Sequence, residues 1–139
     1  MIGLDTNIIF SALNLYDSNH GRARALLGRW GALEALVISP VVYSELCASP
    51  DMAGIRVFLG KAQIEVLWEM PEVVWQQAGD ALGQYAIQRR GGQLPRRIVA
   101  DFLIGAHAQH HQLSLMSLDD TVYRAIFPGL KLIIQTKGG

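Results

Sequence analysis

The sequence predicts an α/β fold, a three-layer sandwich in which helices cover both faces of a short central parallel sheet. Short apolar runs alternate with stretches of helical periodicity along the whole chain, which is the pattern of parallel-sheet proteins. Almost none of these runs alternates apolar with polar residues, so we expect strands that are buried on both faces. The length of 139 residues suits one domain, expected over residues 1–135 and followed by a frayed tail at 136–139.

Five short apolar runs are the predicted strands. They are too short to be helices of ordinary length, and turn or capping residues separate them from the helical stretches. The strands are expected at residues 1–4, 35–38, 64–68, 113–117 and 130–134.

Capping residues and prolines mark where the predicted helices begin. Asp5-Thr6-Asn7 and Ser18-Asn19-His20 are typical cap sequences, and Pro40 and Pro71 suit the first position of a helix. The helices are expected over residues 8–15, 20–30, 40–46, 55–61, 71–88, 98–111 and 119–127.

The composition excludes several classes of protein. Half of the residues are apolar and only 17% are charged, which argues against a disordered chain. Twelve basic and twelve acidic residues leave no formal net charge, so nucleic acid would have to be bound by a local patch. The single cysteine requires no oxidising compartment. We see no signal peptide and no apolar run near the ~18 residues that span a membrane, so we expect a cytoplasmic protein.

Three acidic residues follow predicted strands. Asp5 comes directly after the first strand, Asp119 follows the strand at 113–117, and Glu45 lies on the helix after the second strand. Ligands of open parallel sheets bind beyond the carboxyl ends of the strands. We therefore expect these three side chains to face one crevice.

A fourth acid, Asp101, lies in a helix whose neighbouring residues are apolar on nearly every side. Such a helix is expected in the interior, where a carboxylate is costly unless it is protonated, paired or bound to a metal. Gly105 follows one turn later, and its cost of about 1 kcal/mol in a helix would be explained by the close approach of a backbone or a ligand.

Clustered carboxylates repel one another and raise each other's pKa unless a cation is present. No lysine or arginine lies within a turn of Asp5, Glu45 or Asp119. Carboxylate-rich sites suit Mg²⁺ or Mn²⁺, and such ions support phosphodiester hydrolysis. The acids therefore predict a metal-dependent hydrolytic site.

The order of these motifs resembles a PIN domain over essentially the whole chain, and among PIN domains the VapC-type toxins of toxin–antitoxin pairs. The resemblance is carried by four acid-bearing segments: residues 4–7, Glu45 after Ser39-Pro40, residues 100–104, and Ser117-Leu118-Asp119. It implies an endoribonuclease dependent on Mg²⁺ or Mn²⁺ that leaves 5′-phosphate and 3′-hydroxyl ends. It also implies a homodimer silenced by a VapB-like antitoxin.

The resemblance further implies a role for each site residue. Asp5 and Asp101 would be the principal metal ligands, while Glu45 and Asp119 would complete the cluster through water or by activating the attacking water. Its supporting residues are Thr6, the Asn7 that braces the first aspartate, and Ser117, where the family often has threonine. The fourth acid could instead be Asp120, although the spacing from Ser117 favours Asp119.

Other interpretations of the same residues remain open. Arg96 and Arg97, just before the Asp101 helix, could contact RNA phosphates or belong to a solvated loop. His107 and His111 have the spacing of a zinc pair, but no third ligand is evident. The same acids would also suit a structure-specific DNA nuclease. A non-enzymatic alternative is a regulatory partner that acts through its antitoxin complex at a promoter.

Overall fold

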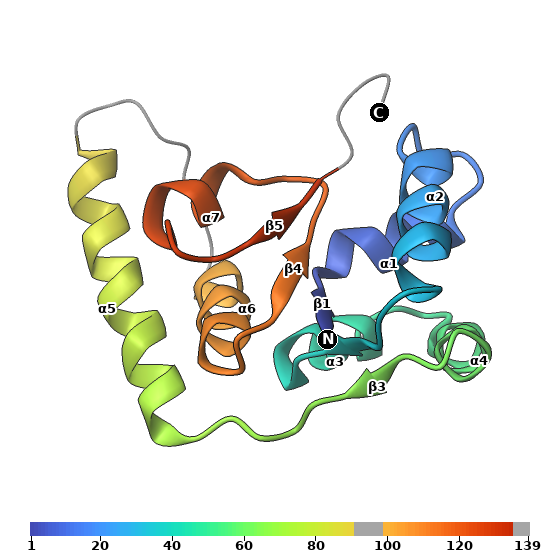
Figure 1. Cartoon of the computed structure of the whole chain (residues 1–139), viewed down its shortest axis with the longest axis horizontal. Helices are drawn as coiled ribbons and strands as arrows, with labels where there is room; N and C mark the ends of the chain where they lie inside the picture. The colour runs from blue at the N-terminus through green and yellow to red at the C-terminus, as the bar shows by residue number, and fades with distance from the viewer. Residues whose placement is uncertain (91–98, 135–139) are drawn as a thin grey trace.

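A computed structural model describes residues 1–90 and 99–134 of the chain. Five parallel strands form one sheet in the order β3-β2-β1-β4-β5 (Figure 1). The strands are β1 (Ile2–Leu4), β2 (Leu36–Ile38), β3 (Glu65–Val66), β4 (Ser114–Met116) and β5 (Leu132–Ile133). Because β1 and β4 are far apart in sequence, their pairing of Leu4 with Met116 brings two distant segments together at the centre of the sheet.

The described helices lie on both sides of the sheet, as the three-layer prediction requires. They are α1 (Thr6–Leu13), α2 (His20–Gly31), α3 (Pro40–Cys47), α4 (Met52–Lys61), α5 (Glu72–Arg89), α6 (Val99–His110) and α7 (Thr121–Ile126). In Figure 1, α5 and α6 lie on one side of β1 and β4, while α1 and α2 lie on the other. The predicted α/β sandwich is therefore confirmed.

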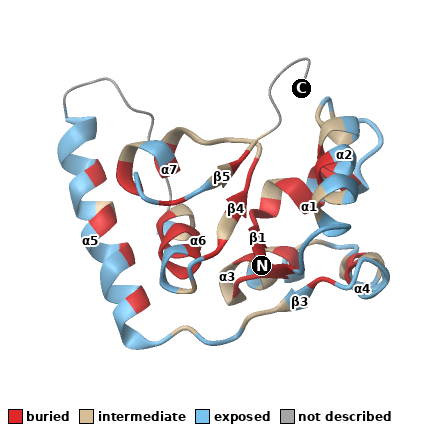
Figure 2. Cartoon of the chain, in the orientation of Figure 1, coloured by how far each residue is buried: buried red, intermediate tan, exposed pale blue. Residues whose placement is uncertain are grey.

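The core occupies the space between these layers. Every residue of β1 and β2 is buried, and α5 buries residues only along one face, which is turned toward α6 (Figure 2). Burial of a large aliphatic side chain stabilises a fold by about 1.5–3 kcal/mol, so these continuous apolar strands account for much of the driving force. No described helix has both the length and the apolar character needed to cross a membrane.

Two helices begin where the sequence places a capping residue. The side chain of Ser39 accepts a hydrogen bond from Val42 N at 3.1 Å, with Pro40 at the first helical position. The helix α1 begins at Thr6 rather than at the expected residue 8, because Asp5 alone is the N-cap and its carboxylate accepts from Thr6 N. Side-chain acceptors at this position satisfy amide groups that lack a partner in the first turn.

The helices α4 and α6 end in the same way before they lead into strands β3 and β4. Gln63 and Gln112 both have a φ of 56°, a left-handed conformation that glycine adopts at no steric cost. Ile64 N donates to Leu59 O at 2.9 Å, and Leu113 N donates to Ala108 O at the same distance. These hydrogen bonds end both helices. In each case a glutamine adopts the left-handed conformation, which is less favourable for it than for glycine.

Gly105 allows a close approach, but not the one expected from the sequence. A Cβ at this position would lie 2.5 Å from a ring carbon of Phe127. The group that needs the space is therefore an aromatic side chain at the end of α7, and not a backbone or a ligand. The frayed tail at 136–139 and the start of the predicted helix at residue 98 lie outside the described residues, and the single-domain boundary stays a prediction.

Candidate active site

The candidate site lies beyond the carboxyl ends of β1 and β4. Asp5 follows β1 directly, and its backbone N–H donates to Met116 O, the last residue of β4, at 2.9 Å. Ser117 then follows β4, so the parallel pairing places Asp5 and Ser117 side by side although 112 residues separate them.

Asp5 is buried, with 6% of its surface exposed, and three neutral donors hold its carboxylate. Thr6 N donates to Oδ1 at 2.8 Å, whereas the hydroxyls of Ser117 and Tyr123 donate to Oδ2 at 2.8 and 2.9 Å. Burial raises the pKa of Asp5, the three hydrogen bonds oppose that rise, and the negative charge of Glu45 adds to it. Among residues 1–90 and 99–134, the hydrogen bonds to Asp5 come from neutral groups, so dipoles rather than a cation hold its charged form.

Glu45 lies on α3 and is linked to Asp5 through Thr6. Thr6 joins the two, because its backbone N–H binds Asp5 while its hydroxyl donates to Glu45 Oε1 at 2.7 Å. One residue of the first predicted motif therefore orients both carboxylates, and the two acids are close enough for Glu45 to affect the pKa of Asp5.

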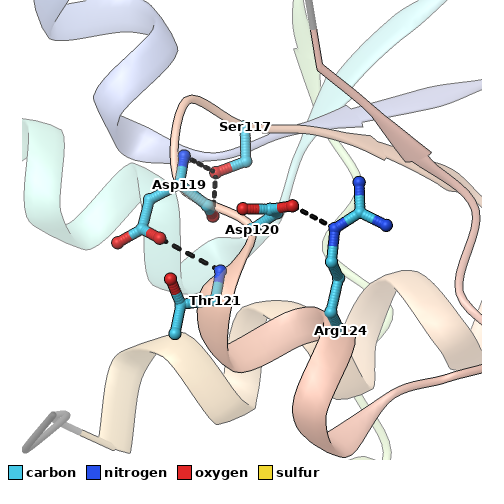
Figure 3. Close-up of polar contacts among 5 residues, drawn as sticks. All are labelled: Ser117, Asp119, Asp120, Thr121 and Arg124. Carbon is cyan, nitrogen blue, oxygen red and sulfur yellow. Dashed lines mark hydrogen bonds and ion pairs between the residues drawn. The ribbon is translucent and has the colours of Figure 1, made fainter. Parts of the chain in front are cut away.

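The segment from Ser117 to Thr121 holds the next acid, Asp119, through a small set of hydrogen bonds (Figure 3). Asp119 N donates to Ser117 Oγ at 3.1 Å, and Thr121 N donates to Asp119 Oδ1 at 3.0 Å. Asn7 braces the same segment, since its Oδ1 accepts from Leu118 N at 3.2 Å and its Nδ2 donates to Ser117 Oγ at 3.4 Å. Asn7 therefore supports the neighbour of Asp5 rather than Asp5 itself.

Asp120 has a different environment from Asp119. Its Oδ2 forms an ion pair with Arg124 one turn later on α7 (Figure 3). An acid that already has a cationic partner is a weaker ligand for a metal. The choice between Asp119 and Asp120 as the fourth acid stays a prediction, in which the spacing from Ser117 favours Asp119.

Asp101 lies in the first turn of α6 and is half-buried, whereas the seven residues that follow it are buried. The helix is packed in the interior, as expected, but Asp101 itself is less buried than expected, because it lies in the first turn, where the backbone dipole favours a negative charge. The argument from burial applies instead to Asp5. Arg96 and Arg97, proposed from the sequence to contact phosphates, lie outside the described residues.

Tyr123 is a residue that the sequence reasoning missed. It lies on α7, is 1% exposed, and donates its hydroxyl to Asp5. Burial raises the pKa of Tyr123 well above its ordinary value, and the charges of Asp5, Asp101 and Asp119 raise it further. Three of the four predicted acids therefore raise the pKa of the same tyrosine hydroxyl. The available signal was that a buried tyrosine needs a partner for its hydroxyl.

The donor set fits a hard divalent cation, although the described side chains do not form a ready metal cage. Among residues 1–90 and 99–134, no group of three or more His, Cys, Asp or Glu side chains is placed to hold a metal ion. The acids nevertheless offer carboxylate oxygens, which Mg²⁺ and Mn²⁺ prefer, and Mg²⁺ commonly takes only one or two carboxylates and keeps several waters. A cation beside Asp5 would offset the cost of its burial and the repulsion from Glu45.

The histidines serve a different purpose. His107 Nε2 lies 2.9 Å from Leu67 O and His111 Nε2 lies 2.7 Å from Glu69 O. Burial lowers the pKa of His107, and the nearby His111 and His110 lower it further. Both Nε2 atoms are therefore used to fix the segment between β3 and α5 against α6, which gives no support to a zinc pair.

Comparison with known proteins gives matches at the level of family and fold. The protein-family model described as "PIN domain" matches residues 2–127. The chain is similar to VapBC2 from Rickettsia felis bound to a DNA fragment from their promoter, with a TM-score of 0.61, 21% identity, and coverage of 96% of this chain and 98% of that chain. It is also similar to VapBC-1 from nontypeable Haemophilus influenzae, with a TM-score of 0.65 and 19% identity over 96% and 98% of the two chains.

A toxin–antitoxin complex from Klebsiella pneumoniae gives a TM-score of 0.62 at 19% identity, and covers 98% of this chain and 97% of that chain. At these identities the likeness establishes the fold. Comparison with curated protein sequences gave no significant match.

Proposed function

This chain belongs to the PIN domain family, and from that membership we propose that it is an endoribonuclease that uses Mg²⁺ or Mn²⁺ to hydrolyse RNA phosphodiester bonds. The observation that carries the proposal is the state of Asp5. This carboxylate is buried at the carboxyl end of the sheet, its hydrogen-bond donors are neutral, and the charge of Glu45 raises its pKa further. A divalent cation resolves that unfavourable arrangement, and metal-assisted hydrolysis is the chemistry that it supports.

Asp5 and Asp101 would be the principal ligands, with Glu45 and Asp119 completing the set through water or by activating the attacking water. When bound, the metal supplies a nucleophile at neutral pH and stabilises negative charge on the phosphate oxygens. The protein's own residues orient the acids: Thr6 holds both Asp5 and Glu45.

Ser117 supports the same site, because its hydroxyl lies against Asp5 and against the segment that carries Asp119. Asn7 fixes that segment from α1. We further propose that Arg96 and Arg97 contact the substrate's phosphates, since guanidinium groups suit phosphate geometry.

The biological role that we propose is that of the toxin in a toxin–antitoxin pair. The fold is similar over nearly its full length to chains of VapBC and other toxin–antitoxin complexes. On this proposal the protein acts in the cytoplasm as a homodimer, and a VapB-like antitoxin silences it.

The test is cleavage of structured RNA by the purified chain with Mg²⁺ or Mn²⁺. Asp5→Asn and Asp101→Asn are expected to lower the rate at least 100-fold, because each replaces a charged ligand with a neutral amide. Asp80→Asn, which changes an exposed acid on α5, is the matched control and should retain the full rate. Equal cleavage by all of these proteins, at a rate that follows the amount of purified chain, would rule out the assigned acids.

Matched RNA and DNA substrates separate the proposed activity from that of a structure-specific DNA nuclease. If the chain acts only as a regulatory partner, neither substrate is cut, and promoter binding is seen only when the antitoxin is present.

A further inference from the structure

We propose that Tyr123 is a positioning residue whose hydroxyl fixes the orientation of the Asp5 carboxylate for binding a divalent cation. Its Oη donates to Asp5 Oδ2 at 2.9 Å across a separation of 118 residues. This inference rests on the proposed function, since it assigns Tyr123 a task in the same site. Tyr123 does not itself hold the metal or touch the substrate.

The hydrogen bonds around Asp5 show why Tyr123 matters more than its neighbour Ser117. The Ser117 hydroxyl carries one proton but lies within reach of two acceptors, Asp5 Oδ2 at 2.8 Å and Asp119 O at 2.9 Å. It can serve only one of them at a time. When Ser117 donates to Asp119, Tyr123 is the hydroxyl that still holds Oδ2.

The surroundings of Tyr123 keep this donor in place. Tyr123 is 1% exposed, and Val122 and Ile126 of the same helix, α7, are buried as well. The hydroxyl donates to Asp5 Oδ2 from a residue that is closed off from solvent, so the ring has little freedom to turn the donor away. A neutral, immobile donor is well suited to orient a metal-binding carboxylate.

The position of α7 gives the same hydroxyl a wider role. Asp119 lies in the segment that opens α7, Asp101 lies on α6, and Asp5 follows β1. The Tyr123 hydroxyl on α7 bonds the Asp5 carboxylate. The bond from Tyr123 to Asp5 therefore ties α7, and the acid at its start, to the centre of the sheet.

The experiment separates the hydroxyl from the ring. Tyr123→Phe removes the donor and keeps the buried ring. Tyr43→Phe is the control, because it makes the same change on α3, where the Tyr43 ring packs edge-on against Trp68. Mn²⁺ binding to the full chain, without RNA, is followed by the electron paramagnetic resonance signal of the free ion. We expect Tyr123→Phe to weaken Mn²⁺ binding by about 10- to 100-fold, as for other outer-shell partners of metal ligands, and Tyr43→Phe to leave it unchanged.

The outcomes distinguish this inference from the proposed function. If Tyr123→Phe binds Mn²⁺ as tightly as the unchanged chain while Asp5→Asn loses binding, the positioning role is wrong and the metal site stands. If Asp5→Asn also binds normally, both ideas are overturned. A loss of thermal stability in Tyr123→Phe with unchanged Mn²⁺ affinity would mark the hydroxyl as merely structural.

A second measurement serves if Tyr123→Phe does not fold. The unchanged chain holds four tyrosines, which can be labelled with ¹³C at the ring carbon that bears the hydroxyl and assigned through Phe variants of the other three. On titration with Mg²⁺, the Tyr123 resonance should shift in proportion to metal binding, and the shift should vanish in Asp5→Asn. A Tyr123 resonance that does not respond to Mg²⁺ would contradict the inference.

Discussion

Replacing Gly105 by alanine tests the packing that joins the two helices of the site, α6 and α7. The new Cβ would lie 2.5, 2.8 and 3.0 Å from three carbons of the Phe127 ring. Phe127 is 5% exposed, so its ring has little room to turn away. Overpacking of a core costs about 1–3 kcal/mol, whereas alanine gains about 1 kcal/mol over glycine in a helix. Since the contact is severe, we expect a net loss of about 1–2 kcal/mol.

The assay is thermal and urea unfolding of Gly105→Ala beside a matched control. Gly83→Ala introduces the same methyl group on α5, where no atom lies within 4 Å of the new Cβ. It should raise the free energy of unfolding by up to about 1 kcal/mol, while Gly105→Ala should lower the Tm by roughly 4–8 °C. In a Phe127→Leu background the Gly105→Ala change should become neutral or stabilising. A Gly105→Ala chain as stable as Gly83→Ala would refute this account of the contact.

Three further predictions concern the site and the strand entries. Thr6→Val keeps the backbone donor to Asp5 but removes the hydroxyl bond to Glu45. RNA cleavage should slow about 10-fold while the Tm changes little. An unchanged cleavage rate would show that Glu45 does not need this hydrogen bond. Because burial raises the pKa of Asp5, the folded chain holds this proton to higher pH than the unfolded chain. The contribution of Asp5 to stability is therefore fully present below about pH 4, its ordinary range, and is lost as the pH rises through the raised pKa. In EDTA, the free energy of unfolding of the unchanged chain should fall relative to that of Asp5→Asn as the pH rises from about 4 through the raised pKa. Adding Mg²⁺ should reverse this fall. Unfolding free energies that change with pH in parallel in the two proteins would contradict the raised pKa of Asp5. Gln63→Gly and Gln112→Gly relieve a φ of 56° and should each stabilise the fold by about 0.5 kcal/mol in urea unfolding, whereas a loss would show that the glutamine side chains contribute.

The fold could be predicted because its signals are local. Strands buried on both faces give continuous apolar runs, and Asp5, Ser39 and Pro40 mark helix starts by chemistry that acts within a few residues. The order of the strands was not predicted, since it depends on which distant segments pair, such as Ile2 with Ser114.

The site was predicted less completely, for the same reason. Asp5, Glu45 and Asp119 were proposed from their places after strands, and Asp101 from its apolar helix. The depth of Asp101 was misjudged because the nearby Val99 is apolar and yet half-exposed. Periodicity alone does not separate the first turn of a helix from its interior. Tyr123 was missed because its partner Asp5 is 118 residues away, and no local pattern records such a contact.

The central claim is that the acids around Asp5 hold a divalent cation. Anomalous diffraction from crystals of the full chain grown with Mn²⁺ tests it most directly. The account predicts a peak within about 2.0–2.3 Å of carboxylate oxygens of Asp5 and Asp101, with Glu45 and Asp119 close by or joined through water. A chain that shows no peak at saturating Mn²⁺, or only peaks away from Asp5, would contradict it.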